Sequence, residues 1–413
     1  MAILISNIKA LVNVRETQHL LRGEDLAELP LLENAYLIVE KEAIVKYGWM
    51  EDLAYSPEDF AFHYDASGRF VLPSWCDSHT HTVFAGSREN EFVDKIKGLD
   101  YAAIAAKGGG ILNSAQKLNA LSEDELYVQA LDRLKALTLL GTGAIEIKSG
   151  YGLTVEGELK MLRVIHRLKQ AVAMPIKASF LGAHTIPTEY RENREGYISL
   201  IIDEMLPQIA QQGLADYIDV FCEKGFFSPE ETERICKAGI ALGLKPKIHA
   251  NQLHVSGGVE AGVKLGAISV DHLESMDETT IQTLANSTTI GTLLPTAAFF
   301  LRMPYQPARQ LLDAGCAIAL ASDFNPGSSP SGNMNFVVAL SCIQMRMLPE
   351  EAINAATLNG AYAMEVAEEV GSITVGKRAN LIITKQIPSL AYLPYSFGSN
   401  LIERVMLSGS WLQ

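Results

Sequence analysis

Two histidines separated by one residue, His79 and His81, carry the strongest chemical signal in the sequence. Alternate residues of a β-strand point to the same side, so both imidazoles are able to face one ion. Imidazole and carboxylate groups together are typical ligands of Zn²⁺ or Fe. A lone His-x-His pair is often incidental, so its meaning depends on which other ligands the fold brings near it.

Further polar residues stand where short apolar runs of the sequence end. Three more histidines and one aspartate occupy such positions: His184, His249, His272 and Asp323. In a barrel of parallel strands, the carboxyl ends of the strands lie on one face, where active sites are built. We therefore predict that His249 and Asp323 join the histidine pair as the protein ligands of one metal ion.

Such an ion predicts hydrolytic chemistry. A water molecule bound to it becomes a nucleophile near neutral pH, and a bound carbonyl group is polarised. The carbon of an amide or amidine is the natural target of both effects. Asp323 is able to take the proton of this water as a general base while it touches the metal, or to act purely as a ligand, and only geometry separates these roles.

The elements that must hold these residues alternate along the middle of the chain. Apolar runs lie at residues 70–76, 144–148, 176–181, 217–222, 246–250, 267–271, 289–294 and 317–322, and amphipathic stretches at 122–140, 155–171, 197–212 and 228–242. Ser228-Pro229-Glu230-Glu231 is a helix-start signature. Alternating strands and helices in eight units predict a (β/α)8 TIM-like barrel.

The two ends of the chain have a different pattern. Strand-like runs occur at residues 35–39 and 43–47, and again at 371–383 and 404–407. We predict a small β-sandwich domain assembled from residues 1–66 and 361–413. The barrel, residues 67–360, is then inserted between its two parts.

Composition limits the classes of function. The chain has 413 residues, a net charge of -14 and five scattered cysteines without a paired C-x-x-C spacing. We expect no nucleic-acid partner, because the acidic surface repels one. We expect no membrane partner either, since neither a signal peptide nor a membrane-spanning run is readable. Reduced cysteines favour a cytoplasmic enzyme, and a homodimer is the commonest assembly for such a chain.

Several segments around the polar residues match the motifs of one family. They are residues 79–92, 108–111, 146–153, 180–184, 220–225, 271–274, 322–329 and 376–383. Together these segments resemble the imidazolonepropionases, which are amidohydrolases of histidine degradation. The resemblance spans the barrel and the C-terminal tail, and it is specific through the combination rather than through any one segment.

The resemblance implies an activity and a set of residues. The reaction would be hydrolysis of 4-imidazolone-5-propanoate to N-formimidoyl-L-glutamate with one Zn²⁺ or Fe ion per chain. The metal ligands carried over by motif are His79, His81, His249 and Asp323. The residues that would surround the substrate or product are Arg88, Tyr151, His184, Gln252, Asn325, Gly327 and Ser328.

The chemistry of these residues supports some of the roles and leaves alternatives open. Arg88 offers a two-pronged donor for the propionate carboxylate, or is a solvated loop residue. His184 is able to donate to an oxygen that gains negative charge, or belongs to the core. Tyr151 contacts the substrate ring, or packs with its hydroxyl group satisfied. Residues 325–329 present backbone N–H groups to a carboxylate, or form a plain turn, and Gly108–Gly110 hinges a covering loop or is a simple turn.

Two positions depart from the family pattern. Asn251 stands where aspartate is frequent, which alters the support of the metal site. Gln252 replaces a glutamate of some members, and a neutral amide cannot act as a base. The catalytic residues are then Asp323, His272 and Gln252, with the proton handled by Asp323 or His272. His272 is equally well explained as a structural neighbour of the metal.

Alternative functions are a deaminase of the same superfamily, acting on a heterocyclic base, and a catalytically inactive scaffold. The deaminase would share the metal ligands but would not need Arg88. Relatives with two ions bridge them through a carboxylated lysine on the fourth strand. Lys148 lies on the second predicted strand and Lys224 beyond the end of the fourth, so an ordinary role for both lysines and a single metal are favoured.

Overall fold

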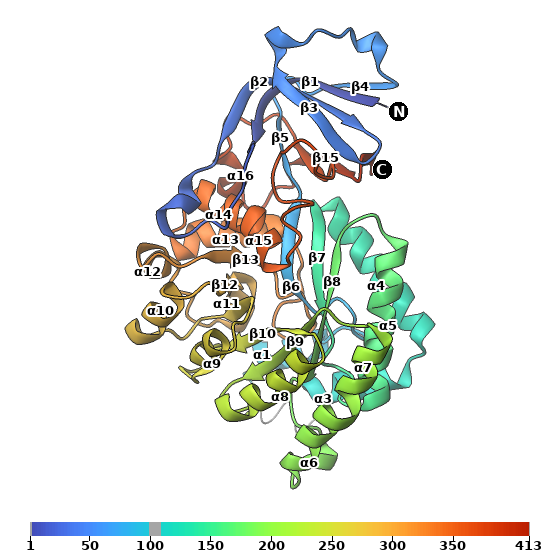
Figure 1. Ribbon diagram of the computed structural model, residues 1–413, viewed down its shortest axis with the longest axis vertical. Coiled ribbons are helices and arrows are strands. Elements are labelled where there is room, and N and C mark those ends of the chain that lie inside the picture. The colour runs from blue at the N-terminus through green and yellow to red at the C-terminus, as the bar shows by residue number, and fades with distance from the viewer. Residues whose placement is uncertain (1, 99–108, 413) are drawn as a thin grey trace.

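The computed structural model describes residues 2–98 and 109–412 of the chain. These residues contain two sheets of eight strands each, stacked end to end in Figure 1. Gly108, which belongs to one of the motif segments, lies outside the described residues. Among the described helices, none is both long and apolar enough to cross a membrane.

The larger sheet is the predicted (β/α)8 barrel. Its strands are β6 (Trp75–Thr80), β7 (Thr142–Lys148), β8 (Ile176–Ala183), β9 (Tyr217–Cys222), β10 (Lys245–Ala250), β11 (Ser269–His272), β12 (Ile290–Leu293) and β13 (Ile318–Leu320). Neighbouring strands are parallel and follow one another in chain order. The residues after β13 close the ring, because the Asp323 amide donates to the His79 carbonyl at 3.0 Å and the His81 amide to the Phe324 carbonyl at 2.9 Å.

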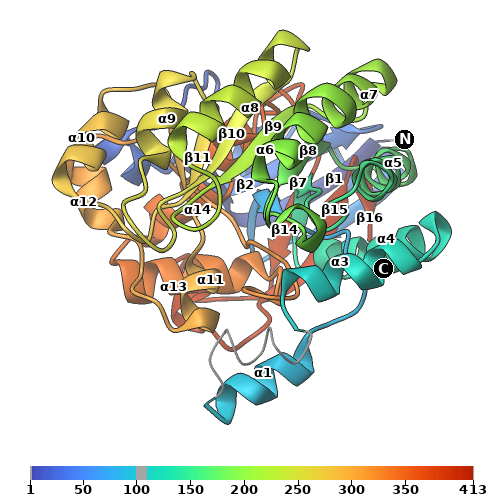
Figure 2. The same ribbon diagram turned by 90° about the horizontal axis from the view of Figure 1, so that it is seen from below.

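Helices surround these strands, as the view along the barrel in Figure 2 shows. They are α1 (Glu89–Ile96), α3 (Ile111–Ala120), α4 (Glu123–Leu139), α5 (Val155–Ala171), α6 (Arg194–Ser199), α7 (Leu206–Gln212), α8 (Pro229–Ala241), α9 (Gly258–Lys264), α10 (Glu278–Ala285), α11 (Pro295–Leu301), α12 (Ala308–Asp313), α13 (Met334–Met345), α14 (Pro349–Ala356), α15 (Leu358–Ala363) and, in the C-terminal tail, α16 (Tyr392–Tyr395). The helix-start signature is confirmed, since Ser228 and Glu231 form a reciprocal cap on α8.

The helix expected over 197–212 is not continuous. A π-helical segment, Leu200–Met205, separates α6 from α7. Pro207 follows this segment and has no backbone N–H to donate to the preceding turn, which is a physical reason for the wider turn there.

The strand expected over 70–76 is wrong as a single element. Its first part forms β5 (Phe70–Pro73), which pairs with the small sheet, and the barrel begins only at Trp75. The partner changes at Ser74, whose amide donates to the Asn380 carbonyl, whereas the amide of Trp75 donates to Gly141. The proposed division of the chain near residues 66 and 360 stays a prediction.

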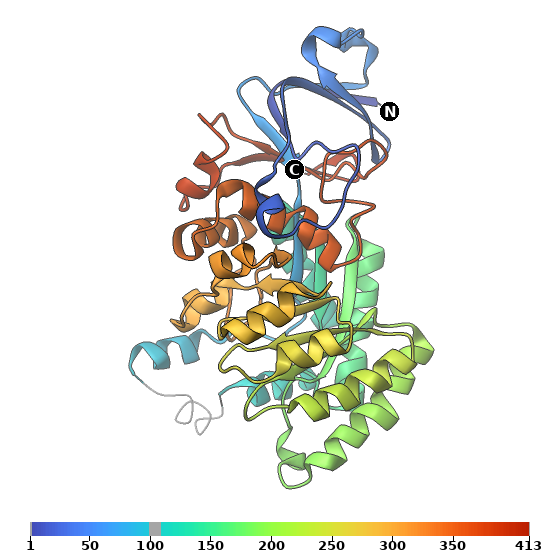
Figure 3. The same cartoon turned by 60° about the vertical axis from the view of Figure 1, so that its left-hand side comes forward.

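The predicted small β domain is present and draws on both chain ends, which Figure 3 places together at one end of the molecule. Besides β5 it contains β1 (Ala2–Val12), β2 (Leu31–Glu40), β3 (Ala43–Trp49), β4 (Phe62–Asp65), β14 (Leu381–Thr384), β15 (Ile402–Leu407) and β16 (Ser410–Trp411). These strands form a mixed sheet, in which β5 bridges the N-terminal strand β1 and the C-terminal strand β14. Ile5, Leu37, Val71, Leu381 and Met406 share its buried core.

Candidate metal centre and substrate cavity

The predicted polar residues converge at the carboxyl ends of the barrel strands. His79 ends β6 and His81 follows it, His249 lies on β10, His272 ends β11, and Asp323 follows β13. One cavity is lined by His81, Arg88, Tyr151, His184, His249, Gln252, His272, Asp323, Asn325, Gly327 and Ser328. His79 is fully buried beneath it. Every residue expected at the site is therefore part of this cavity or of its floor.

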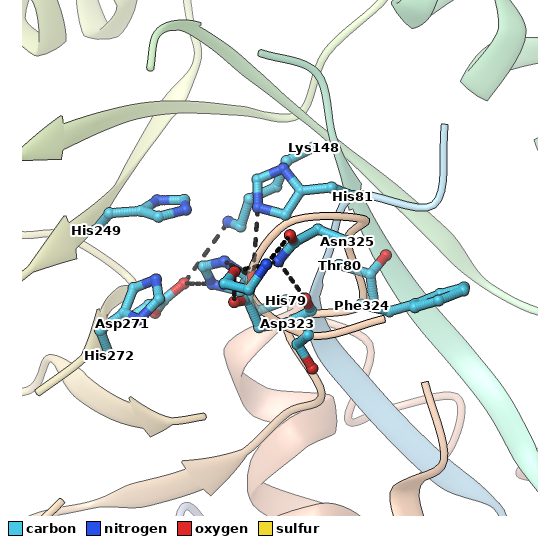
Figure 4. A network of polar contacts seen from close by, with 12 residues as sticks. His79, Thr80, His81, Lys148, His249, Asp271, His272, Asp323, Phe324 and Asn325 are labelled. Atoms are coloured by element: carbon cyan, nitrogen blue, oxygen red, sulfur yellow. Dashed lines mark hydrogen bonds and ion pairs between the residues drawn. The ribbon is translucent and has the colours of Figure 1, made fainter. Parts of the chain in front are cut away.

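The four predicted ligands meet at the floor (Figure 4). Nε2 of His79 and Nε2 of His81 each lie 3.6 Å from the same oxygen of Asp323, Oδ1. Ligand atoms of His79, His81 and His249 lie within 4.8 Å of one another, as do those of His79, His272 and Asp323. All of these side chains are buried.

This geometry fits a bound metal ion. Ligands that surround one ion tetrahedrally at about 2.0–2.1 Å stand roughly 3.4 Å apart, close to the two 3.6 Å separations measured here. Nε2 of His79 and both ring nitrogens of His249 are buried and have no hydrogen-bond partner among the described residues. Burying a nitrogen without a partner costs free energy, unless an ion or an ordered water molecule binds to it.

The histidines of this cluster are held neutral, as metal ligands must be. Burial lowers the pKa of His79, His81 and His249 well below the usual value, and the neighbouring histidines and Lys148 lower it further. Burial likewise raises the pKa of Asp323 to about 6, against the opposite effect of His272.

Two aspartates that sequence reasoning did not assign stand directly behind the ligands. Asp271 Oδ2 lies 2.6 Å from Nδ1 of His79, and Asp219 Oδ2 lies 3.0 Å from Nδ1 of His249. The hydrogen bond to Asp271 fixes the Nδ1–H form of His79 and so turns its Nε2 toward the cluster. Asp219 lies at ion-pair distance from His249 without a hydrogen bond to its ring. The sequence signal for these two aspartates is a charged residue inside an apolar strand run, because such a charge needs a buried partner.

Glu274 is a further residue that was not assigned. Its side chain is buried, and its Oε1 lies 3.5 Å from Nδ1 of His272. Positive φ angles of 91° at His272 and 67° at Leu273 turn the chain sharply between the two side chains. Burial alone would lower the pKa of His272, but Glu274, Asp323 and Asp271 outweigh it and raise that pKa above its usual value. His272 therefore differs from the neutral ligand histidines around it.

The expected role of His184 changes with its hydrogen bond. Nδ1 of His184 lies 3.0 Å from the carbonyl oxygen of Gly150, so Nδ1 carries the proton and donates it. Burial lowers the pKa of His184 to about 4, and the ring is neutral at pH 7. Nε2 is then an acceptor, and the expected donation to a substrate oxygen would need a second proton.

Arg88 lies at the rim of the cavity, next to α1. Its Nε and Nη2 donate to one oxygen of Glu91, at 2.9 and 2.5 Å. The other oxygen of Glu91 accepts the amide of Gly110 at 3.0 Å, which fixes the carboxylate. Nη1 lies against Gly327, where an added Cβ atom would come within 2.3 Å of it. Glu91 therefore orients the guanidinium group with Nη1 toward the cavity wall.

Two backbone amides of the turn over 325–329, those of Gly327 and Ser328, are not free to bind a ligand. Oδ1 of Asn325 accepts the amides of Gly327 and Ser328, each at 2.8 Å. This Asx-type turn satisfies the two N–H groups internally. The hydroxyl of Ser328 instead donates to Oδ2 of Asp323 at 3.0 Å, leaving Oδ1 to face the histidines.

The two departures from the family pattern fall in different places. The Oδ1 atom of Asn251 accepts the amide and hydroxyl of Ser256, at 3.2 and 3.1 Å, so this side chain braces the loop after β10. Support of His249 comes from Asp219 instead. Gln252 lines the cavity. Lys224 is exposed on the loop after β9, in keeping with an ordinary solvated lysine.

Comparisons with known proteins agree with this arrangement. Residues 70–412 match the model of the amidohydrolase family. The chain is 58% identical to the imidazolonepropionase of Flavobacterium johnsoniae over 410 residues, which is 99% of each chain. It is 44% identical to the imidazolonepropionase of Clostridium tetani, over 94% of this chain and 93% of the relative.

Solved structures of the same architecture are much more distant in sequence. The E. coli guanine deaminase superposes with a TM-score of 0.75 at 13% identity, covering 100% of this chain and 99% of that one. A triazine hydrolase variant superposes with a TM-score of 0.74 at 15% identity, covering 100% of this chain and 94% of that one. An adenosine deaminase from Xanthomonas campestris with bound zinc superposes with a TM-score of 0.68 at 16% identity, covering 99% of this chain and 92% of that one. Likenesses at this identity support the fold alone.

Proposed function

This chain belongs to the amidohydrolase family and, within it, to the imidazolonepropionases, and we propose that it hydrolyses 4-imidazolone-5-propanoate to N-formimidoyl-L-glutamate. One observation carries the proposal beyond the family. A cluster of buried histidines and Asp323 lies on the floor of a cavity whose rim carries Arg88. Metal chemistry and recognition of a carboxylate are thereby combined in one cavity.

We propose one Zn²⁺ or Fe ion per chain, held by His79, His81, His249 and Asp323. A bound ion of this kind acidifies a water molecule and polarises a carbonyl oxygen. The surrounding side chains then determine which carbonyl is attacked and where the protons go.

Arg88 binds the propionate and places the ring over the cluster. His184, neutral and protonated on Nδ1, accepts a ring N–H at Nε2. His272 is held toward its protonated form by Glu274 and donates to the oxygen that gains charge during attack. Gln252 hydrogen-bonds the ring without taking a proton.

Asp323 accepts the proton of the attacking water, because its carboxylate lies at the floor of the cavity beside the ligand histidines. The oxygen of that water bonds to the ring carbonyl carbon, and the carbon–nitrogen bond of the cyclic amide breaks. The proton passes to the departing nitrogen, so one water molecule is consumed and the product gains a carboxylate.

The direct test is ultraviolet monitoring of 4-imidazolone-5-propanoate consumption by protein of measured metal content. Turnover should scale with bound metal. Guanine and cytosine serve as the comparison substrates, since a deaminase would release ammonia from them and would not need a substrate carboxylate. Turnover of those bases in place of the imidazolone would contradict the proposal.

We also propose that the partner of this chain is the small carboxylate-bearing substrate, with no nucleic-acid or membrane partner. The net charge of -14 supports the first exclusion. The five cysteines are all free, which supports a cytoplasmic location. A homodimer stays an expectation that light scattering would test.

Arg88→Met should lower kcat/KM. The loss should correspond to about 2–4 kcal/mol of transition-state stabilisation, which is the cost of leaving a buried charge without its partner. The reason is that an acidic chain needs a local cation to bind an anionic substrate. Steady-state kinetics on the metallated variant measures the loss.

Lys95→Met is the matched control, because Lys95 is a second cation lining the same cavity. We expect this variant to lose less activity than Arg88→Met, because an ammonium group lacks the planar two-donor fork that matches a carboxylate. The Arg88→Met defect should also disappear for a substrate analogue that lacks the carboxylate. Equal losses with and without the carboxylate would assign Arg88 to the fold rather than to the substrate.

A further inference from the structure

A chain of buried charges lies beneath the metal cluster, and the mechanism above does not use it. Its members are Lys247 and Lys148, with Glu146, Asp219 and Asp271, and all five side chains are fully inaccessible to solvent. Buried charges at this depth are expensive unless each has a partner of opposite sign. The arrangement of the partners therefore shows what the network holds in place.

Lys148, at the end of β7, occupies the centre of this network. Its Nζ lies 2.5 Å from Oε1 of Glu146, 2.8 Å from Oδ2 of Asp219 and 3.6 Å from Oδ2 of Asp271. Figure 4 shows the ammonium group pointing toward the same side of the cluster as Asp271. Three carboxylates thus surround one ammonium group, which has three N–H donors.

The oxygens that face Lys148 are the same ones that face the ligand histidines. Oδ2 of Asp271 is 2.6 Å from Nδ1 of His79, and Oδ2 of Asp219 is 3.0 Å from Nδ1 of His249. The second oxygen of each aspartate is fixed separately, by the hydroxyl of Ser269 at 2.5 Å and by the amide of His249 at 3.1 Å. One cation therefore bridges the two carboxylates that orient two histidines.

We propose that Lys148 is the positioning cation of the metal centre. Its ammonium group holds the carboxylates of Asp219 and Asp271 in place behind His249 and His79, so that both imidazoles present Nε2 to the ion. Without it, the carboxylates would repel one another at close range in a medium of low dielectric. One of them would then turn away, and its histidine would lose the carboxylate that stands behind its ring.

The same geometry provides a matched control. Lys247 is equally buried and pairs with the other oxygen of Glu146. Its further contacts are the carbonyls of Ser78 and Ala363, each at 3.2 Å, and the ring of Tyr217. Lys247 touches neither aspartate in the contacts of the described residues. Lys148→Met and Lys247→Met therefore remove the same charge from the same network, and only the first removes the cation behind the ligands.

The proposal rests on the metal centre of the proposed function, so the experiment begins with the metal content of the wild-type chain. Affinity for Zn²⁺ and for Co²⁺ is then measured by competition with a chelator. Visible absorption of the Co²⁺ form reports the ligand geometry. Lys148→Met should bind either ion about 10–100-fold more weakly, the range for lost support of a ligand, with a shifted Co²⁺ spectrum. Lys247→Met should keep the affinity and the spectrum, although both variants lose thermal stability in excess chelator.

The outcomes separate the two proposals. A wild-type chain that binds no metal would overturn the metal centre and this inference together. Wild-type binding with unchanged affinity in Lys148→Met, or an equal loss in Lys247→Met, would overturn this inference alone. If Lys148→Met does not fold, Asp271→Asn replaces it, because the amide keeps the shape and removes the charge between Lys148 and His79. Unchanged affinity and spectrum in that variant would also overturn the proposal.

Discussion

His249→Ala should yield a folded chain that loses most of its metal and its hydrolase activity. His249 supplies a neutral imidazole from β10 whose Nε2 has no other partner among the described residues. Removing a ligand should cost more than the roughly 10–100-fold of a lost supporting contact. Metal analysis after gel filtration measures the loss, and circular dichroism checks the fold.

His254→Ala is the control for this variant. His254 follows the same strand by four residues, but its side chain is 54% exposed and pairs with Glu223 at 3.1 Å, away from the cluster. We expect this variant to retain both metal and turnover. A full equivalent of metal in His249→Ala would remove His249 from the ligand set and leave the cluster of His79, His272 and Asp323 as the site.

Local rules were sufficient to bring the candidate ligands together. His79 and His81 alternate on one strand, and His249 and Asp323 stand at strand ends, so the strand period and the barrel topology together predict one site. Neither rule depends on side-chain packing. The role of each candidate ligand stays a prediction, because it depends on how the metal ion binds.

The support behind the ligands could not be predicted in the same way. Lys148, Asp219 and Asp271 each lie inside or at the end of an apolar strand run, which indicates buried charges but not their partners. Pairing depends on which strands are neighbours and on their register, and β9–β11 place Asp219 and Asp271 on the two sides of His249. A single sequence does not contain that register.

Roles that depend on hydrogen positions also changed with the structure. The sequence predicts His184 to be a donor to a substrate oxygen or a core residue, but its hydrogen bond to the carbonyl of Gly150 makes Nε2 an acceptor. The side-chain oxygen of Asn325 similarly accepts the amides of Gly327 and Ser328, so these amides do not bind a substrate carboxylate.

In the small domain, β1 lies at the centre of the sheet although it was not among the expected strands. Asn7 and Lys9 interrupt the apolar pattern of its sequence.

Gln252 and Asp323 divide the work in the proposed mechanism, and the division predicts a large difference between their variants. Gln252→Ala should cost about 10–100-fold in kcat/KM, the scale of a lost supporting contact, because an amide orients the ring but takes no proton. Gln306→Ala is its control. Gln306 is equally buried and does not line the cavity, so its loss should leave kcat/KM nearly unchanged.

Asp323→Asn should be far more damaging than Gln252→Ala. Oδ1 of Asp323 lies 3.6 Å from Nε2 of both His79 and His81, and Oδ2 is held by the hydroxyl of Ser328 at 3.0 Å. The amide keeps this shape but removes a ligand charge and the proposed proton acceptor together. Metal content and kcat, measured on the same preparations of both variants, separate the two losses. If a fully metallated Gln252→Ala chain fell to the metal-free background while Asp323→Asn kept substantial turnover, Gln252 would be essential and Asp323 could not be the base.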